Sequence, residues 1–554
     1  MRFLLLCVAV SAQSERGSIT GVVSDPGGAV VANAMVQAKN ADTGAVYPTA
    51  TTATGNYAIA ELPPGTYQVS VNVSGFKQYV RTGLTLLAGQ TLRIDAALEV
   101  GATSETVTVS ESAPLLKTES GELSHNVATN SMDDIPMLTM NTNIRQPLTV
   151  TELLPGTAYI PNPSLPALLT VRVNGTPTNS ERLRVEGQDA TDELGQGAAS
   201  QTQGSVDAIE EFAIQTSNFA AEFGLAGGVV YNVIMKSGGN QLHGSAYEYW
   251  ANDALNAGVP FTNNGNGGLL RPAVRRNDYG FTFGGPVWIP KVYKGRDKTF
   301  FFFSLEQYPI SQTTNNLFNT VPTAAYRAGN FTQALTGRTL GTSPLGTPIM
   351  ENEIFDPATQ QMVNGQLVRS GFPNNTIPPT RLDPVALNIQ ALIPLPTQPG
   401  LVNNGAYPFT TPITTTIPSL KIDHLLSNKQ KLSFYWQWDH YWGKAPGTGL
   451  FEGFPQPISQ GSESHYDSHI WRVSYDNTLA PTLLLHLGMG YNDNFNRGVP
   501  PTTNFNATTQ LGLQGPFTPY SFPSIQGLSS AQGGVNPGQS GGSDSLGPAG
   551  AIQN

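Results

Sequence analysis

The chain has 554 residues, enough for several domains, and only 12% of them are charged, roughly half the ~25% usual in globular proteins. Its 58 glycines and 42 prolines argue against an all-helical fold, because both residues weaken helix interiors. The net charge of −10 argues against a phosphate-binding surface, so nucleic acid is not an expected partner. The one cysteine, Cys7, excludes a disulfide framework or a cysteine-ligated zinc site in the rest of the chain.

The first residues predict an export signal. Arg2 precedes the apolar run from Phe3 to Val10, and small residues follow up to Ala12. This pattern is typical of a secretory signal peptide, which we expect to occupy residues 1–13. No later segment reaches the roughly 18 consecutive apolar residues of a spanning helix, so any part of the mature protein in a membrane would consist of strands.

Residues 14–100 have the pattern of a small β-sandwich. Short β-rich runs alternate with turn signals such as Asp25-Pro26-Gly27-Gly28 and Thr54-Gly55-Asn56. Val69, Val71 and Val73 alternate with polar residues, as expected of a strand with one buried face.

These residues resemble the carboxypeptidase regulatory-like domain, also described as a carbohydrate-binding-like, transthyretin-type sandwich. The resemblance lies in Gly17 to Val23, Thr54 to Tyr57, Leu62 to Tyr67 and Ser74 to Phe76. No histidine occurs before His125, so the resemblance implies a structural or docking module without peptidase chemistry.

The following region resembles a second family through several motifs in the right order. Residues 173–193 and 205–257 resemble the plug and first barrel strand of TonB-dependent receptors of the Oar-like group. Motifs downstream support the resemblance: Arg276 to Gly280, Gly284 to Val287, Lys298 to Phe303, Ile377 to Ala386 and Lys421 to His424.

The resemblance implies a plug at residues 101–235 and part of an outer-membrane β-barrel at residues 236–554. It also implies a receptor in the outer membrane with its N-terminal domain in the periplasm. Such a receptor would take up a scarce solute of the siderophore, glycan or peptide class, energised through the TonB protein. The solute itself cannot be read from the loops.

Alternating strands support a barrel independently of the resemblance. In Gln430 to Trp442, Leu432, Phe434, Trp436 and Trp438 share one face with His440 and Trp442, and the other face carries mainly polar residues. Thr482 to Phe495 and Asp278 to Gly284 repeat the pattern. A row of aromatic residues opposite small or polar ones favours a strand between lipid and lumen over a soluble sheet. The fold class expected is therefore mainly β: a sandwich, a plug and part of a transmembrane antiparallel barrel.

Long segments between these strands suit extracellular loops. Residues 309–350 and 394–418 are rich in Asn, Gly, Pro and Thr, and connections of such length are unusual inside compact domains. We expect both to be loops on the outer side of the membrane. Residues from 240 onward would supply about six to eight spanning strands, whereas plugged transporters have about 22, so the chain is expected to be an N-terminal fragment.

Candidate site residues are few. In the resembled family an energy-coupling segment, the TonB box, precedes the plug and pairs with TonB as an added strand. Its position here is taken by Glu105, Thr106, Val107, Thr108, Val109 and Ser110. An ordinary last strand or linker explains this segment equally well.

Two other groups of polar residues are weighed as sites. His465, Asp467 and His469 would share one strand face and have the ligand types of a transition-metal site; the same face continues with aromatic residues, and no metal site is assigned. Adjacent carboxylates at Asp133-Asp134 and Glu210-Glu211 would point to opposite faces in extended structure and indicate solvated surface or the start of a helix.

No catalytic arrangement and no cofactor motif is recognised, so an enzyme is not expected. The alternative to a transporter is a cell-surface adhesion or carbohydrate-binding β-protein that displays binding loops without transport. The outer-membrane lipid and a small solute, possibly a carbohydrate, are the other partners considered.

Overall fold

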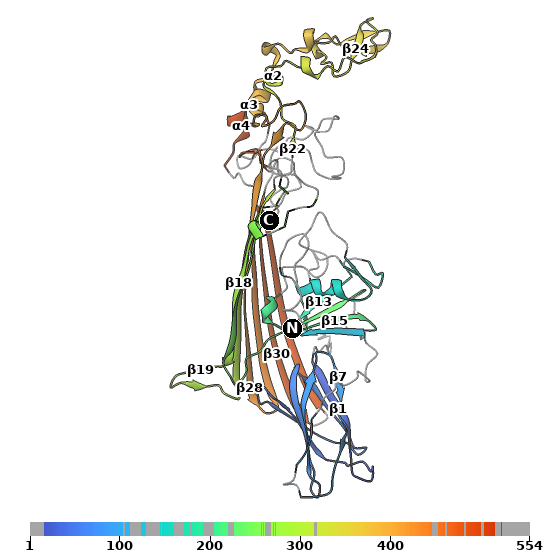
Figure 1. Cartoon of the computed structure of the whole chain (residues 1–554), viewed down its shortest axis with the longest axis vertical. Coiled ribbons are helices and arrows are strands. Elements are labelled where there is room, and N and C mark those ends of the chain that lie inside the picture. Colours follow the sequence, from blue (N-terminus) through green and yellow to red (C-terminus); the bar gives the residue numbers. More distant parts are fainter. Residues whose placement is uncertain are drawn as a thin grey trace, which may run out of the picture.

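The computed structural model forms three successive β units, followed at one end by a unit of loops (Figure 1). It describes residues 16–102, 106–110, 123–128, 145, 147–159, 171–177, 180–191, 204–219, 227–255, 257–258, 260, 268–269, 271, 273–314, 318–445, 453–459, 462–480, 483–499, 504–515 and 522. The expected signal peptide at residues 1–13, Glu105 and the Asp133-Asp134 pair lie outside the described residues.

The first unit is a β-sandwich, as predicted. One sheet has the order β4-β1-β7, with β8 also paired to β1, and the other has the order β3-β2-β5-β6-β9. Val69 and Val71 are fully buried between the sheets, and Gly21 passes so close to the facing chain that an added Cβ would lie 1.8 Å from the Ile94 carbonyl oxygen. The strands are β1 (Gly17–Ser24), β2 (Met35–Asn40), β3 (Val46–Ala50), β4 (Asn56–Leu62), β5 (Gly65–Asn72), β6 (Gln78–Leu86), β7 (Thr91–Arg93), β8 (Ala96–Ala97) and β9 (Thr106–Ser110).

The middle unit is built on a five-stranded sheet of order β10-β15-β16-β13-β14. All residues of β16 are buried, and the rings of Phe212 and Tyr231 stack 5.7 Å apart across β15 and β16. The elements are β10 (Leu123–Ala128), η1 (Pro147–Leu153), β11 (Thr157–Tyr159), β12 (Val171–Val173), β13 (Arg182–Val185), β14 (Gln188–Asp189), η3 (Val206–Ala208), β15 (Ile209–Ser217) and β16 (Val230–Met235).

The third unit is one long antiparallel sheet of seven strands, each paired with the next along the chain. Its first and last strands do not pair with each other, so the sheet is open. The strands are β17 (His243–Asn252), β18 (Ala273–Pro286), β21 (Thr299–Thr314), β28 (Phe409–Ser427), β29 (Gln430–Ala445), β30 (Ser462–Ala480) and β31 (Leu483–Val499). They contain all three of the strands that the sequence predicts.

The polarity of this large sheet is inverted relative to a soluble protein. In β29 the polar residues Ser433, Gln437 and Asp439 are buried, whereas Leu432 on the opposite face is 39% exposed. In β31, Met489 is 71% exposed. Apolar residues outward and polar residues inward are what lipid on one side and a lumen on the other require, and the predicted faces are confirmed.

The two ends of the large sheet differ in their connections. At one end the connections are brief, at residues 428–429, 481–482 and 287–298; this is the short-turn end. At the other end residues 253–272, 315–408 and 446–461 connect the strands; this is the long-loop end. The sandwich lies at the short-turn end, and the middle unit lies along one face of the sheet (Figure 1).

The loop unit at the long-loop end has its own apolar core, formed by the cluster Val321, Phe454, Ile458, Phe505, Ala507, Leu511 and Phe522. It contains η5 (Asp253–Leu255), β22 (Phe318–Asn319), α2 (Ala324–Arg327), η6 (Thr332–Ala334), β23 (Thr339–Thr342), β24 (Pro348–Met350), η7 (Pro357–Thr359), β25 (Gln361–Val363), β26 (Gln366–Val368), η8 (Pro373–Asn375), η9 (Pro379–Arg381), α3 (Pro384–Leu392), β27 (Gly405–Ala406) and α4 (Ala507–Leu511).

The predicted loop limits were wrong at two places. Residues 309–314 belong to β21, where they pair with residues 409–414 of β28. Residues 415–418 also belong to β28 and pair with residues 305–308. Threonine favours strands, and two paired strands can continue past the membrane into water with polar side chains. The proline and threonine content therefore did not mark a loop there. Within the part of the chain that the structure describes, no helix is both long and apolar enough to cross a lipid bilayer.

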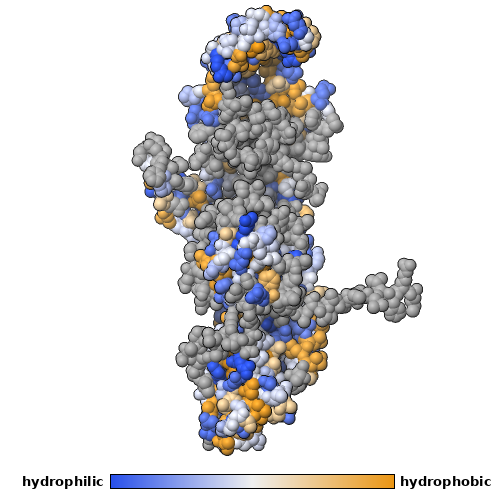
Figure 2. Space-filling model, turned by 90° about the vertical axis from the view of Figure 1, so that its right-hand side faces the viewer, coloured by the Kyte–Doolittle hydropathy of each residue, from blue (hydrophilic) through white to orange (hydrophobic). Residues whose placement is uncertain are grey.

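Figure 2 shows the side of the molecule that carries the sandwich and the middle unit, with hydrophilic and hydrophobic residues mixed over the sandwich at one end and the loop unit at the other.

Candidate functional site

The candidate site is the inward, polar face of the large sheet where the middle unit lies against it. Three apolar side chains of the sheet, Phe302, Tyr435 and Ile470, join the core of the middle unit. Hydrogen bonds, ion pairs and ring contacts also join the two units. They form three groups along the sheet.

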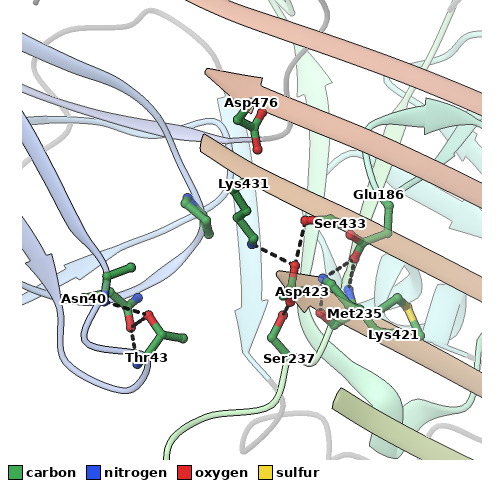
Figure 3. Close-up of polar contacts among 12 residues, drawn as sticks. Asn40, Thr43, Glu186, Met235, Ser237, Lys421, Asp423, Lys431, Ser433 and Asp476 are labelled. Carbon is green, nitrogen blue, oxygen red and sulfur yellow. Dashed lines mark hydrogen bonds and ion pairs between the residues drawn. The ribbon is translucent and has the colours of Figure 1, made fainter. Parts of the chain in front are cut away.

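The first group, which we call the junction network, lies near the short-turn end (Figure 3). Asp423 of β28 is buried and accepts from the Lys431 ammonium at 2.8 Å and from the hydroxyls of Ser433 and Ser237, each at 2.6 Å. Ser237 follows the last strand of the middle unit, so this carboxylate links the sheet to that unit. Three partners of this kind satisfy a carboxylate that burial would otherwise destabilise.

The junction network also contains a buried ion pair between the two units. The Lys421 ammonium lies 2.8 Å from the Glu186 carboxylate and donates to the Met235 carbonyl oxygen at 2.9 Å. Glu186 in turn accepts from the Met235 backbone N–H at 2.8 Å. Glu186 stands in the tight turn between β13 and β14 with a φ of 52°, so the turn itself aims its side chain at the sheet.

The second group is centred on Arg472 of β30, whose side chain is 1% exposed. Its guanidinium donates to the Val185 carbonyl oxygen at 3.2 Å and to the Asp189 carbonyl oxygen at 3.0 Å. The Asn492 amide on the neighbouring strand donates to the same Asp189 oxygen at 2.9 Å. The large sheet therefore binds the β13–β14 turn through the backbone carbonyl oxygens of that turn.

The third group is centred on Arg145, which precedes η1. Its guanidinium lies 2.9 Å from the Asp207 carboxylate of η3 and 4.0 Å from Glu306 of β21, and it stacks 4.4 Å from the ring centroid of Tyr249. Burial alone would lower the pKa of Arg145, but the carboxylates of Glu306 and Asp207 outweigh it and raise the pKa above its ordinary value. The cation is thus fixed between the middle unit and the sheet.

The sandwich is attached at the same end as the junction network. Arg16 lies 2.6 Å from the Asp476 carboxylate of β30, and the Asn240 amide donates to the Thr43 carbonyl oxygen at 3.0 Å. On the middle unit, Glu211 accepts from the Ala88 backbone N–H at 2.8 Å and also from Asn126. A cavity of about 760 Å³, lined by residues of all three units, lies between these attachments.

Glu211 corrects one prediction. Glu210 and Glu211 do point to opposite faces, but Glu211 is 3% exposed and joins the middle unit to the sandwich, so it is not solvated surface. The partner that buries it, Ala88, lies 123 residues away in the sequence. An adjacent pair of carboxylates carries no signal of such a contact.

The other predicted site residues are placed as follows. His465, Asp467 and His469 share one face of β30, as predicted, but Asp467 contacts His440 Nδ1 at 2.7 Å and Trp438 Nε1 at 3.0 Å. Across the described residues, no three metal-ligating side chains gather into one group.

Thr106 to Ser110 form β9, the edge strand of a sandwich sheet, in parallel pairing with β6. Within the described residues β9 has no strand on its other side. This segment is therefore an ordinary last strand of the sandwich by its position. Its unpaired edge could also accept an added strand.

Two family models match the chain. A family model described as an outer membrane beta barrel domain matches residues 234–553, and one described as a carboxypeptidase regulatory-like domain matches residues 18–99. The chain is 27% identical over 277 residues to the TonB-dependent transporter Oar of Myxococcus xanthus, an alignment that covers 48% of this chain and 24% of that protein. The chain therefore spans about a quarter of the length of that curated relative.

Solved structures with partial likeness include two outer-membrane receptors. The outer membrane transporter YddB from Escherichia coli has 12% identity, coverage of 69% of this chain and 40% of that chain, and a TM-score of 0.40. The ferric yersiniabactin uptake receptor FyuA from Yersinia pestis has 10% identity, coverage of 68% and 49%, and a TM-score of 0.33.

The named relatives are described as transporters and as an uptake receptor. The match of residues 234–553 spans more than half of the chain. The chain belongs to the family of the outer membrane beta barrel domain, and its N-terminal part matches the carboxypeptidase regulatory-like domain.

Proposed function

We propose that the protein takes part in TonB-dependent uptake of a scarce solute across the outer membrane, with the middle unit acting as the plug. The observation that carries the proposal is the docking of the middle unit on the polar face of the large sheet. Hydrogen bonds and ion pairs join the two units at Asp423, Lys421 and Arg472, beside the apolar contact of Phe302, Tyr435 and Ile470. Water can replace the polar contacts when a plug is pulled, and the apolar contact involves only these three side chains of the sheet in that cluster.

The orientation in the membrane follows from the two ends of the sheet. Outer-membrane barrels have short periplasmic turns and longer extracellular loops. The short-turn end would therefore face the periplasm, with the sandwich beneath it, and the loop unit would face the medium. This arrangement agrees with export directed by residues 1–13.

The coupling segment proposed is Glu105 to Ser110, of which Thr106 to Ser110 form β9. Strand addition requires a backbone edge that is not already paired. β9 pairs with β6 on one side, and Thr108 is an exposed residue in its middle. In the proposed mechanism TonB adds a strand to this edge, and force on β9 is passed along the chain to the plug.

A binding measurement tests this proposal. The full chain in detergent is titrated with the periplasmic domain of TonB, and Thr108→Pro is compared with Thr108→Ala. Proline removes a backbone donor from the strand, so Thr108→Pro should lose binding, while Thr108→Ala keeps the backbone and should bind like the parent chain. Absence of binding by the parent chain would contradict the transport proposal and favour the adhesin alternative; equal binding by Thr108→Pro would place the coupling segment elsewhere.

The proposed solute belongs to one of three classes: siderophores, glycans or peptides. It would bind to the loop unit and the plug, and uptake would depend on the proton gradient through TonB. The 760 Å³ cavity between the three units lies at the proposed periplasmic exit.

A further inference from the structure

One surface element is used neither by the docking of the middle unit nor by the proposed transport. It is the outward hairpin, residues 287–298, which contains β19 (Trp288–Ile289) and β20 (Tyr293–Lys294). It leaves the short-turn end of the large sheet on the side opposite the middle unit and runs roughly across the strand direction (Figure 1). If the strands cross a membrane, this hairpin lies along the membrane surface.

Its composition differs from that of the rest of the chain. Three apolar side chains are exposed to solvent: Trp288 by 67%, Ile289 by 49% and Val292 by 79%. Its four cations, Lys291, Lys294, Arg296 and Lys298, are all exposed, and its one carboxylate is Asp297. Four cations and one carboxylate give a net charge of +3 in a chain whose net charge is −10.

The hairpin is held in place by its own backbone. The Val287 N–H donates to the Thr299 carbonyl oxygen and the Gly295 N–H donates to the Val287 carbonyl oxygen, each at 2.8 Å. A Cβ on Gly295 would lie 2.6 Å from the Val287 oxygen, so only glycine fits at the base. The Asp297 carboxylate accepts from the Asn240 amide at 2.7 Å, which ties the base of the hairpin to the segment before β17. The apolar tip is therefore presented outward by a defined turn.

The hairpin begins where the lipid-facing surface of the sheet ends. Phe283 of β18 is 45% exposed, and its ring centroid lies 5.5 Å from that of Phe301 on β21. Trp288 follows Phe283 by five residues along the chain. Tryptophan and lysine together are typical of the layer between hydrocarbon and water, where a ring reaches the acyl chains and an ammonium reaches the headgroups.

We propose that the outward hairpin is a membrane-surface anchor that binds anionic phospholipid of the periplasmic leaflet. Trp288, Ile289 and Val292 would lie at the acyl boundary, and Lys291, Lys294 and Arg296 would contact headgroup phosphates. Both halves of the surface match this occupant: an apolar tip for the acyl boundary and a local positive charge for anionic headgroups. The inference rests on the proposed orientation in the membrane and does not depend on transport.

Quenching by lipid tests the position of the tip. The full chain with Cys7→Ser carries one cysteine at Val292→Cys, labelled with nitrobenzoxadiazole, in vesicles of phosphatidylethanolamine and phosphatidylglycerol. Matched labels at Met489→Cys, which is 71% exposed on β31, and Met362→Cys, which is 65% exposed in the loop unit, give the lipid and water references. Nitroxide-labelled lipid should quench positions 292 and 489 and leave 362 bright, and aqueous iodide should quench 362 alone.

The outcomes separate this inference from the membrane placement. A label at 292 that behaves like the one at 362, while 489 is quenched by lipid, would overturn the anchor but leave the spanning sheet intact. If nitroxide-labelled lipid quenches neither the label at 292 nor the label at 489, the sheet does not lie in lipid. That result would refute both the proposed orientation in the membrane and the membrane-surface anchor.

Headgroup selectivity tests the cations. For the label at 292, quenching by nitroxide-labelled phosphatidylglycerol is compared with quenching by the matching phosphatidylcholine. The anionic lipid should be preferred in the parent chain, and Lys294→Gln should reduce that preference by roughly fivefold. Lys444→Gln, an exposed lysine near the other end of β29, should not change it. Equal quenching by both lipids in the parent chain would overturn the binding of anionic headgroups.

Discussion

The buried ion pair between Glu186 and Lys421 joins the middle unit to the large sheet, and breaking it should loosen the middle unit. The two side chains are 11% and 8% exposed and their charged atoms lie 2.8 Å apart. Removing one partner of a buried pair leaves the other charge uncompensated, at a cost of about 3 to 5 kcal/mol. Glu186→Gln keeps an oxygen for the Met235 N–H, so about 3 kcal/mol is the appropriate figure here.

Hydrogen exchange of the full chain measures this cost. A loss of about 3 kcal/mol should raise the rate at which β16 amides exchange through local opening by roughly a hundredfold. The double variant Glu186→Gln with Lys421→Met removes both charges and should return to within about 1 kcal/mol of the parent. Glu351→Gln breaks an exposed pair with Arg338 in the loop unit and serves as the control. The reasoning is refuted if Glu186→Gln leaves β16 exchange unchanged, or if the double variant opens as readily as the single one.

Three further predictions concern the middle unit and the sandwich. Arg145→Leu should lower the thermal midpoint of the middle unit, measured by near-ultraviolet circular dichroism, because it leaves the carboxylates of Asp207 and Glu306 without their cation. The midpoint of Arg145→Lys should lie between those of the parent and Arg145→Leu, because lysine keeps the charge but loses the planar stacking on Tyr249. Identical midpoints for all three chains would contradict this. Gly21→Ala should destabilise the sandwich by several kcal/mol in denaturant titrations, because its Cβ would lie 1.8 Å from Ile94 O. Gly341→Ala, with nothing within 4 Å of the added Cβ, should be neutral. A neutral Gly21→Ala would show that β1 and the chain at Ile94 are farther apart. Burial raises the pKa values of Tyr57 and Tyr67. The stability that these two rings contribute below the ordinary tyrosine pKa of about 10 should therefore be lost as the pH rises above that value. Absorbance at 295 nm should show the two rings ionising only on unfolding, and their normal titration in the folded chain would refute this prediction.

Strand polarity could be read from the sequence because it is local. Side chains alternate with a period of two along any strand, so the outward and inward faces of β29 follow from the residues themselves. The ring-rich face of Phe434, Trp436 and Trp438 was placed correctly for this reason. The limits of β21 and β28 were missed because the proline and threonine content of these segments was taken as a loop signal, although Pro309 and Pro412 lie in strands that pair with each other.

The docking contacts could not be read from the sequence because they join distant residues. Lys421 and Glu186 are 235 positions apart, and Arg472 contacts a carbonyl oxygen 287 positions away. An inward lysine or arginine on an alternating strand signals only that something polar faces it. Which turn of the middle unit meets it depends on how the two units dock, and no pattern within one strand records that.

The central claim is that the large sheet spans a membrane with its apolar face in lipid and its polar face against the middle unit. The most direct test is spin-label accessibility at successive positions along β29, from Leu432 to Asp439, with the full chain in lipid vesicles. We expect accessibility with a period of two: oxygen dissolved in lipid should reach labels at 432, 434, 436 and 438, and labels at 433, 435, 437 and 439 should be reached by neither oxygen nor a water-soluble nickel reagent. Uniform access of the nickel reagent to both sets, without alternation, would contradict it.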